Sequence, residues 1–234
     1  MACESRADAA PARVLSAAAR GAQRMETMKR DPGLDRWDAR FAQEGFLFGE
    51  KPNAFLASQK HRLHPGMRAL AVADGEGRNG VWLAEQGLDV LSVEGSPVAQ
   101  AKARALAERR GVQVRFELAD FGHWQWPERE FDVIAAIFVQ FAGPDLRARM
   151  FEGMRHALKP GGLLLLEGYG PKQLEYRTGG PPLIEHLYTE DMLREAFAGM
   201  EILELKAYDA VIDEGSGHSG QSALVDLVAR QPER

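Results

Sequence analysis

The sequence predicts an α/β protein with a doubly wound, Rossmann-like sheet that is mostly parallel and ends in an antiparallel hairpin. From residue 68 onward, short apolar runs alternate with helical patterns, the order expected of a parallel sheet with crossover helices. Near the C-terminus, residues 202–211 and 224–229 both have strand composition. The segment 213–220 (DEGSGHSG) that joins them cannot form a crossover helix, so these two strands should pair antiparallel.

The elements of the predicted sheet follow in a regular order. A strand at 68–73 precedes a helix at 79–86, and a second strand occupies 89–93. Ser96 then suits an N-cap and Pro97 suits the first position of a helix that continues to Arg110. The remaining expected elements are strands at 112–118, 131–138 and 163–167 and helices at 145–158 and 189–197.

Composition limits the classes of function. The 234 residues carry a net charge of −5, and the short arginine patches form no basic face, so nucleic acid is not expected as a partner. The single cysteine, Cys3, excludes a disulfide framework and a cysteine-based zinc site, and it fits a reducing cytoplasm. No apolar run is long enough to cross a membrane. Residues 1–30 are expected to be a flexible leader, and residues 31–234 a single domain.

A glycine motif at residues 75–80 (GEGRNG) stands between the first predicted strand and its helix. A turn of this kind lets the backbone pass close to a ligand. Glu94 lies at the end of the next predicted strand, about twenty residues after the start of the motif. An acid at this spacing can accept hydrogen bonds from ribose hydroxyls. The motif therefore indicates a nucleotide-like cofactor. Its literal agreement with the dinucleotide fingerprint leaves a nicotinamide cofactor open.

Further residues carry a resemblance to a known family. The spacing of Gly75, Gly77 and Glu94, together with Ala119-Asp120, residues 159–162 (KPGG) and the closing hairpin, resembles the class I S-adenosylmethionine-dependent methyltransferases. The aromatic segment 37–56 with the GEGRN sequence is similar to the TehB-like and thiopurine-methyltransferase-like small-molecule enzymes. This resemblance implies S-adenosyl-L-methionine as cofactor and a small-molecule acceptor with a sulfur, oxygen or chalcogen nucleophile.

The resemblance also implies roles for particular residues. Gly75 and Gly77 would let the turn approach the cofactor, and Glu94 would hold the ribose. Asp120 would accept a hydrogen bond from the adenine amino group, and Phe138 would flank the sulfonium, since aromatic faces suit a cation. The complete set expected to bind the cofactor is Asp74, Gly75, Gly77, Arg78, Asn79, Glu94, Gly95, Asp120, Phe121 and Phe138.

One part of the motif departs from the family pattern. The family usually has an acid two positions before a first glycine, whereas this chain has Ala71 and Ala73 there. Asp74 is adjacent and could serve instead, and Asn53 or Arg78 could supply another contact. The departure predicts weaker cofactor binding, a different grip on the methionyl amine, or loss of catalysis.

Several side chains allow both a functional and a purely structural interpretation. Segment 35–60 is either a lid over the cofactor or packing on the edge of the sheet. Residues 123–127 (HWQWP) suit a substrate wall or a loop anchored by its tryptophans, and Tyr169 suits a pocket wall. His218 lies in a Gly/Ser-rich loop and is expected to be flexible surface rather than a base. No metal site and no catalytic residue are predicted.

Three functions follow from these patterns. The first is a methyltransferase, which needs mainly alignment of the reacting groups and exclusion of water, and little acid–base help for an anionic nucleophile. The second is an NAD-dependent oxidoreductase, supported by the dinucleotide fingerprint. The third is a non-catalytic cofactor-binding protein on a methyltransferase fold, motivated by Ala71 and Ala73.

Overall fold

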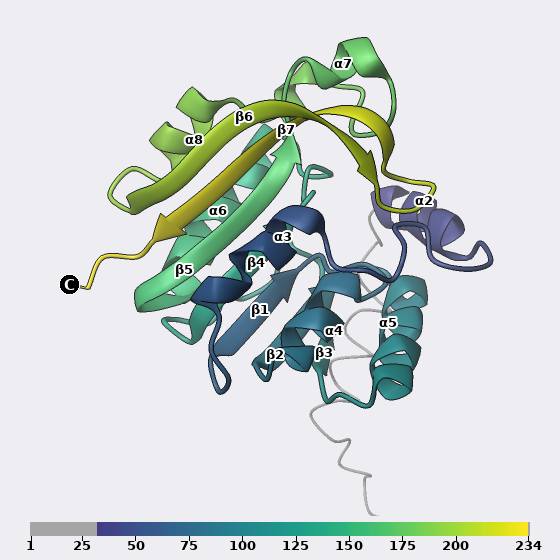
Figure 1. Cartoon of the computed structure of the whole chain (residues 1–234), viewed down its shortest axis with the longest axis horizontal. Helices are drawn as coiled ribbons and strands as arrows, with labels where there is room; N and C mark the ends of the chain where they lie inside the picture. Colours follow the sequence, from purple (N-terminus) through teal and green to yellow (C-terminus); the bar gives the residue numbers. More distant parts are fainter. Residues whose placement is uncertain (1–31, 234) are drawn as a thin grey trace, which may run out of the picture.

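A computed structural model describes residues 32–233, which build a seven-stranded sheet in the order β3-β2-β1-β4-β5-β7-β6 (Figure 1). The first five strands pair in parallel, and β7 runs antiparallel between β5 and β6. The predicted mixed sheet with its C-terminal hairpin is therefore confirmed. The strands are β1 (Arg68–Val72), β2 (Asp89–Glu94), β3 (Arg115–Leu118), β4 (Phe131–Ile137), β5 (Leu158–Tyr169), β6 (Glu201–Asp213) and β7 (Ser219–Arg230).

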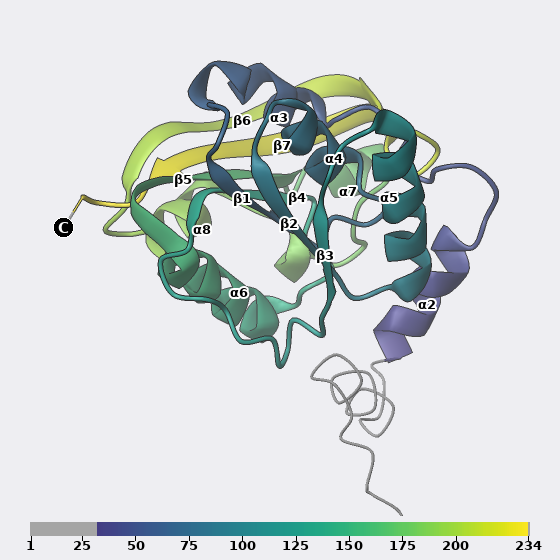
Figure 2. The same cartoon turned by 90° about the horizontal axis from the view of Figure 1, so that it is seen from below.

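Helices cover both faces of the sheet. Figure 2 shows α3, α4 and α5 on one side of the strands and α6 and α8 on the other. The segment of the predicted leader, residues 1–30, lies outside the described residues. The helices are α2 (Pro32–Phe41), α3 (Ala54–Ser58), α4 (Arg78–Glu85), α5 (Pro97–Arg110), α6 (Pro144–Ala157), α7 (Gln173–Tyr176) and α8 (Glu190–Ala196), with short 3-10 turns η1 (Gln59–Arg62) and η2 (Ile184–His186).

The start of α5 has the cap that its sequence predicts. The Ser96 hydroxyl accepts a hydrogen bond from the Ala99 amide at 3.1 Å, and Pro97 occupies the first turn. Gly111 ends the helix in the left-handed conformation. These local signals fix the position of α5, against which α4 and α2 pack.

The core lies on both faces of the central strands β4 and β5. Ile134, Leu164 and Leu166 point into a cluster that includes side chains of α6 and α8. Val133 and Leu165 point to the opposite face, into the cluster that contains residues of α3 and α4. Burial on both faces explains why these strands read as continuous apolar runs.

The KPGG segment differs from its expected place. Residues 159–162 were predicted as a turn before the fifth strand, but β5 already begins at Leu158. Phe131 pairs with Leu158 whereas Val133 pairs with Leu163, so the segment forms a wide bulge within the strand. Gly161 adopts a φ of +74°, and Lys159 binds the Asp132 carboxylate at 2.8 Å. The third strand is also shorter than predicted, beginning at Arg115.

The tryptophans of the HWQWP loop anchor it to the protein. Trp124 and Trp126 meet edge to face with their ring centroids 4.6 Å apart, and the Trp126 ring lies over Gly153 of α6. A Cβ on Gly153 would lie 2.4 Å from that ring. The loop interpretation of residues 123–127 therefore accounts for both tryptophans.

We expect Gly153→Ala to destabilise the fold by roughly 1–3 kcal/mol, because the added methyl must displace the Trp126 ring. The measurement is urea unfolding followed by tryptophan fluorescence. Arg149→Ala, an exposed change on the same helix, is the control and should alter the free energy of unfolding by less than about 0.5 kcal/mol. Equal stabilities of Gly153→Ala and wild type would contradict the anchoring.

Candidate active site

Two strained residues mark the carboxyl edge of the sheet. Ala73, just after β1, has a φ of +48°, and Phe138, just after β4, has a φ of +54°. Such values are unfavourable for residues with a Cβ and concentrate at functional sites. Strands β1 and β4 are neighbours at which the strand order reverses, the place where open α/β sheets bind ligands. Ala73 and Phe138 therefore lie at the edge where the topology places ligands, although Arg129 and Arg177 elsewhere also have a positive φ.

The glycine loop connects β1 to α4 and packs closely. A Cβ on Gly77 would lie 2.6 Å from the Ala103 side chain of α5, and one on Gly80 would lie 2.3 Å from the Asp74 carboxylate. These two glycines are thus required by packing within the protein. Gly75 has a φ of +57°, and a Cβ on it would lie 3.5 Å from the Phe41 ring of α2, an ordinary contact distance. Gly75 is therefore the one of these three glycines at which packing within the protein leaves room for a Cβ.

Asp74 braces this loop from inside. Its side chain is buried, and it accepts hydrogen bonds from the Gly80 amide at 3.1 Å and the Ser92 hydroxyl at 2.8 Å. Burial raises the pKa of Asp74 to about 7, and the nearby Glu94 carboxylate acts in the same direction. The acid predicted to replace the one missing at Ala71 is therefore engaged in holding the turn.

Glu94 ends β2 beside the glycine loop. One carboxylate oxygen accepts from the Gly75 amide and the other from the Ser96 amide, both at 2.8 Å. Burial raises the pKa of Glu94, while these backbone hydrogen bonds oppose the shift. Leu34 of α2 packs against Gly95, where a Cβ would lie 2.7 Å from it. The N-terminal helix thus covers both Glu94 and the loop.

The two residues that follow Gly77 connect α4 to other segments. The Asn79 side chain accepts a hydrogen bond from the Asn53 amide at 2.9 Å. Arg78 forms a buried ion pair of 2.7 Å with Glu214, at the tip of the β6–β7 hairpin. Both residues therefore lie at the predicted site, joined to the segment before α3 and to the hairpin.

Asp120 and Phe121, which follow β3, differ in exposure and in contacts. The Asp120 carboxylate is exposed and accepts from the Gly122 amide at 2.8 Å and pairs with His123 at 2.9 Å. Phe121 is buried in contact with Trp124 and Trp126, so its ring faces the core cluster. The structure leaves Asp120 accessible to a ligand but packs the Phe121 ring away from solvent.

His218 was expected at a flexible surface, and this expectation is wrong. The residue is 7% exposed, and its ring lies 4.3 Å from Phe48 and 4.2 Å from Phe138. Tyr169, at the end of β5, meets it edge-on at 5.6 Å. Burial, followed by the charges of Arg78 and Arg40, lowers the pKa of His218 to about 3.

The reason for this placement lies in the loop's glycines. Gly217 fits beneath the Phe48 ring, where a Cβ would approach to 2.4 Å, and its amide donates to the Leu47 carbonyl at 2.9 Å. A tip rich in glycine can thus press against the segment after α2, as both views of the chain indicate (Figures 1 and 2). The sequence signal was present in Gly215 and Gly217, but it also suits a flexible loop.

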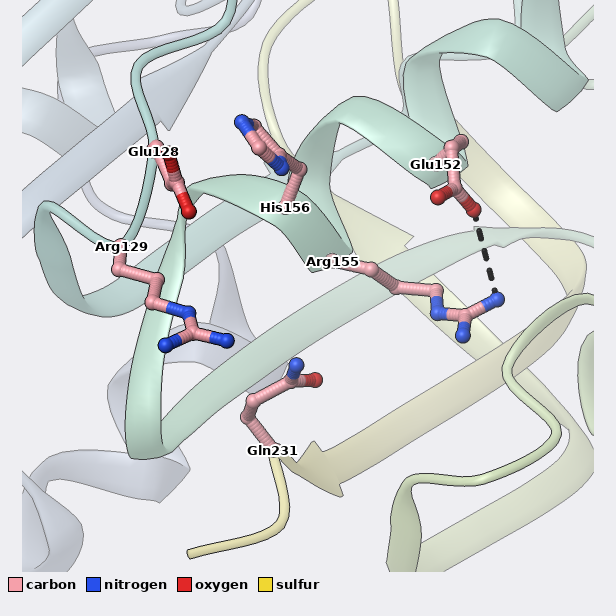
Figure 3. Close-up of a pocket in the computed structure, with 6 residues that line it drawn as sticks. All are labelled: Glu128, Arg129, Glu152, Arg155, His156 and Gln231. Atoms are coloured by element: carbon pink, nitrogen blue, oxygen red, sulfur yellow. Dashed lines mark hydrogen bonds and ion pairs between the residues drawn. The ribbon is translucent and has the colours of Figure 1, made fainter. Parts of the chain in front are cut away.

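A shallow polar hollow lies elsewhere, between the end of α6 and the start of β4 (Figure 3). Within it, Arg155 pairs with Glu152 at 3.4 Å. It occupies the amino edge of the sheet, opposite Ala73 and Phe138, so it is separate from the candidate site, and its own residue Arg129 also has a positive φ, +47°. No cluster of potential metal ligands occurs among residues 32–233. Six residues line the hollow, namely Glu128, Arg129, Glu152, Arg155, His156 and Gln231.

We expect Ala73→Gly to stabilise the chain by roughly 0.5–1 kcal/mol, because glycine relieves the left-handed backbone. Ala71→Gly, in the extended backbone of β1, is the matched control and should destabilise it. Urea unfolding of both variants measures the difference. A loss of stability in both would show that Ala73 is not strained in solution.

Asp74→Asn should change how stability depends on pH. The pKa of Asp74 is raised on folding, so the folded chain retains a proton that the unfolded chain loses, and stability falls as pH rises towards 7. The amide variant lacks this titration. Relative to wild type it should gain roughly 2 kcal/mol between about pH 5 and about pH 8, measured by urea unfolding. A difference between the two proteins that is independent of pH would contradict the shift.

Comparison with known proteins agrees with this geometry. Residues 69–162 match the methyltransferase domain family. A glycine/sarcosine N-methyltransferase of Halorhodospira halochloris is 30% identical over 138 residues, which cover 56% of this chain and 47% of that protein. An uncharacterised protein of Mycobacterium tuberculosis is 35% identical over 101 residues, 43% of this chain and 36% of that protein. The chain therefore matches less than half the length of these two relatives.

Solved structures share the fold at low sequence identity. TehB from Haemophilus influenzae aligns with a TM-score of 0.64 and 18% identity, over 85% of this chain and 67% of that one. The N-methyltransferase NodS of Bradyrhizobium japonicum, solved with S-adenosyl-L-homocysteine, aligns with a TM-score of 0.65 and 14% identity, over 87% and 100%. The chain thus shares the class I fold of these S-adenosylmethionine-dependent methyltransferases, and its residues 69–162 match the methyltransferase domain family.

Proposed function

We propose that this chain transfers a methyl group from S-adenosyl-L-methionine to a small-molecule acceptor. The observation that carries the proposal is Glu94, a buried carboxylate fixed by two backbone amides at the switch point of the sheet, inside the matched methyltransferase domain. A carboxylate has about four acceptor positions, and the Gly95 amide also acts on this one, so capacity remains for a ribose hydroxyl as a further donor. The methyltransferase match also favours this function over a nicotinamide-dependent oxidoreductase.

The other residues divide into those that would contact the cofactor and those that support them. Gly75 would lie against the methionyl part, the accessible Asp120 would accept from the adenine amino group, and Phe138 would flank the sulfonium. Asp74, Gly77 and Asn79 hold the loop and α4 in place. When bound, the sulfonium supplies an activated methyl group, and the chain contributes alignment and exclusion of water. Gly95 and Phe121 position Glu94 and Asp120 through packing.

We also propose that segment 35–60 is a lid over this site. Phe41 lies over Gly75 and Leu34 packs on Gly95, so the helix α2 covers the edge at which the cofactor would bind. Stacked Trp37 and Phe41 rings, 5.5 Å apart, make the cover a single apolar unit. Cofactor entry then requires α2 to move, and closure excludes water from the reaction.

The acceptor is proposed to be a small molecule with a sulfur, oxygen or chalcogen nucleophile. A covered edge with buried aromatic walls suits a compact acceptor better than a polymer. The net charge of −5 keeps nucleic acid an unfavoured partner. Within residues 32–233 no helix has the length and apolar character that a membrane crossing requires.

Isothermal titration calorimetry with S-adenosylhomocysteine, S-adenosylmethionine and NAD tests the function. We expect the two sulfur compounds to bind and NAD to give no heat. Binding of NAD alone would establish the oxidoreductase alternative, and no binding of any compound would favour a non-catalytic role.

Glu94→Gln should weaken S-adenosylhomocysteine binding by roughly 1–3 kcal/mol. The amide carries no negative charge and has one oxygen instead of two, so it cannot accept hydrogen bonds from both ribose hydroxyls as strongly as the carboxylate would. The same acid-to-amide change at Glu117, on the neighbouring strand β3, is the control and should leave the affinity unchanged. Equal affinities of Glu94→Gln and wild type would remove Glu94 from the site.

A further inference from the structure

Three buried polar atoms near the lid have no hydrogen-bond partner. They are Oη of Tyr169, Nδ1 of His218 and Nη1 of Arg78. The residues that carry them are 1%, 7% and 6% exposed. A buried donor left unpaired costs about 1–3 kcal/mol, and such atoms are rare in folded proteins. Three such atoms together at the carboxyl edge of the sheet indicate a site that a ligand could fill.

These side chains come from three segments and form one cluster. The Tyr169 and His218 rings both pack on Phe138, at 4.7 and 4.2 Å. Arg78 joins them through Glu214, which it pairs with at 2.7 Å and whose backbone amide donates a hydrogen bond to the His218 carbonyl at 2.8 Å. Phe48 of the lid segment packs on the His218 ring and so covers the cluster. The strained Phe138 thus contacts both unpartnered rings, which also meet each other at 5.6 Å.

The cluster offers hydrogen-bond donors. Arg78 is a permanent donor, and its ion pair with Glu214 uses Nη2, which leaves Nη1 free. Burial, with Glu214 and Glu167 nearby, raises the pKa of Tyr169, so its hydroxyl keeps its proton. His218 stays a neutral imidazole, which presents one N–H. Guanidinium, hydroxyl and imidazole together suit an anion.

No group in this cluster is free to accept a proton. Burial disfavours an imidazolium at His218, and the charges of Arg78 and Arg40 add to this effect. Glu214 is already bound by Arg78, Asn53 and the Ala54 amide. Glu167 accepts from Asn53 and is hydrogen-bonded to Asp226, its partner across the β5–β7 pairing. An acceptor that reacts here must therefore arrive without a proton to lose.

We propose that Arg78, Tyr169 and His218 bind the methyl acceptor as an anion, which fixes the acceptor class as small organic anions. The inference rests on the proposed methyl transfer and narrows its substrate. The anionic atom bonds to the methyl carbon, and the carbon–sulfur bond breaks with its electron pair remaining on sulfur. The sulfonium becomes a neutral thioether, the anion becomes a neutral methylated product, and no proton moves.

Two isosteric probes test the charge requirement. Benzoate and benzamide have the same shape but differ in charge, and each is titrated into the chain loaded with S-adenosylhomocysteine. We expect benzoate to bind at least about tenfold more tightly. Equal affinities, or no binding of either probe, would overturn the proposal.

A matched pair of tyrosine variants assigns the donor. Tyr169→Phe and Tyr188→Phe each remove one buried, unpartnered hydroxyl, but Tyr188 lies in the core cluster on the other face of the sheet. We expect benzoate affinity to fall roughly tenfold in Tyr169→Phe and to stay unchanged in Tyr188→Phe. Identical behaviour of the two variants would contradict the assignment.

Failure of the two proposals can be told apart. S-adenosylhomocysteine affinity, measured separately, should be the same in wild type and both tyrosine variants. If the wild-type chain does not bind S-adenosylhomocysteine, the methyltransferase proposal is contradicted. The benzoate and benzamide titrations are repeated on the chain without cofactor, so the anion site is decided in that case as well.

Discussion

The covered edge of the sheet depends on the hydrogen bonds and the ion pair that the Glu214 carboxylate makes. One oxygen accepts from Asn53 Nδ2 at 3.1 Å and from the Ala54 amide at 3.0 Å, and the other pairs with Arg78 at 2.7 Å. The bonds join the hairpin tip, the start of α3 and the start of α4. Because Arg78 and Glu214 are both buried, loss of either would strand the other charge away from water. The Glu214 side chain therefore couples the lid segment to the hairpin, alongside the contacts of the tip with Leu47 and Phe48.

This coupling explains how a loop distant in sequence becomes part of the site. With the tip held by Glu214, His218 inserts between Phe48 and Phe138. The same closure leaves donor atoms of Tyr169 and Arg78 buried without partners. A fold tolerates such unmade hydrogen bonds where binding later satisfies them, which supports the proposal that the closed edge binds a ligand.

The sheet was predictable because its signals are local, whereas the closed site was not. Apolar periodicity identified the strands, and Ser96 with Pro97 located the start of α5. The alanine at position 73, noted as a departure from glycine, takes the left-handed φ that a glycine would adopt. His218 escaped prediction because its burial depends on Phe48 and Phe138, contacts between segments far apart in the chain. The bulge at residues 159–162 depends likewise on pairing with Phe131.

Hydrogen–deuterium exchange with and without S-adenosylhomocysteine tests the central claim, that cofactor binding and lid closure occur at this one edge. The account predicts slower exchange in the glycine loop at 75–80, and also in the lid at 41–54 and the hairpin tip at 213–218, which should be protected together. Glu214→Gln should release the lid and the tip together while the loop stays protected. Protection that omits the glycine loop, or a tip and lid that respond independently, would contradict the account.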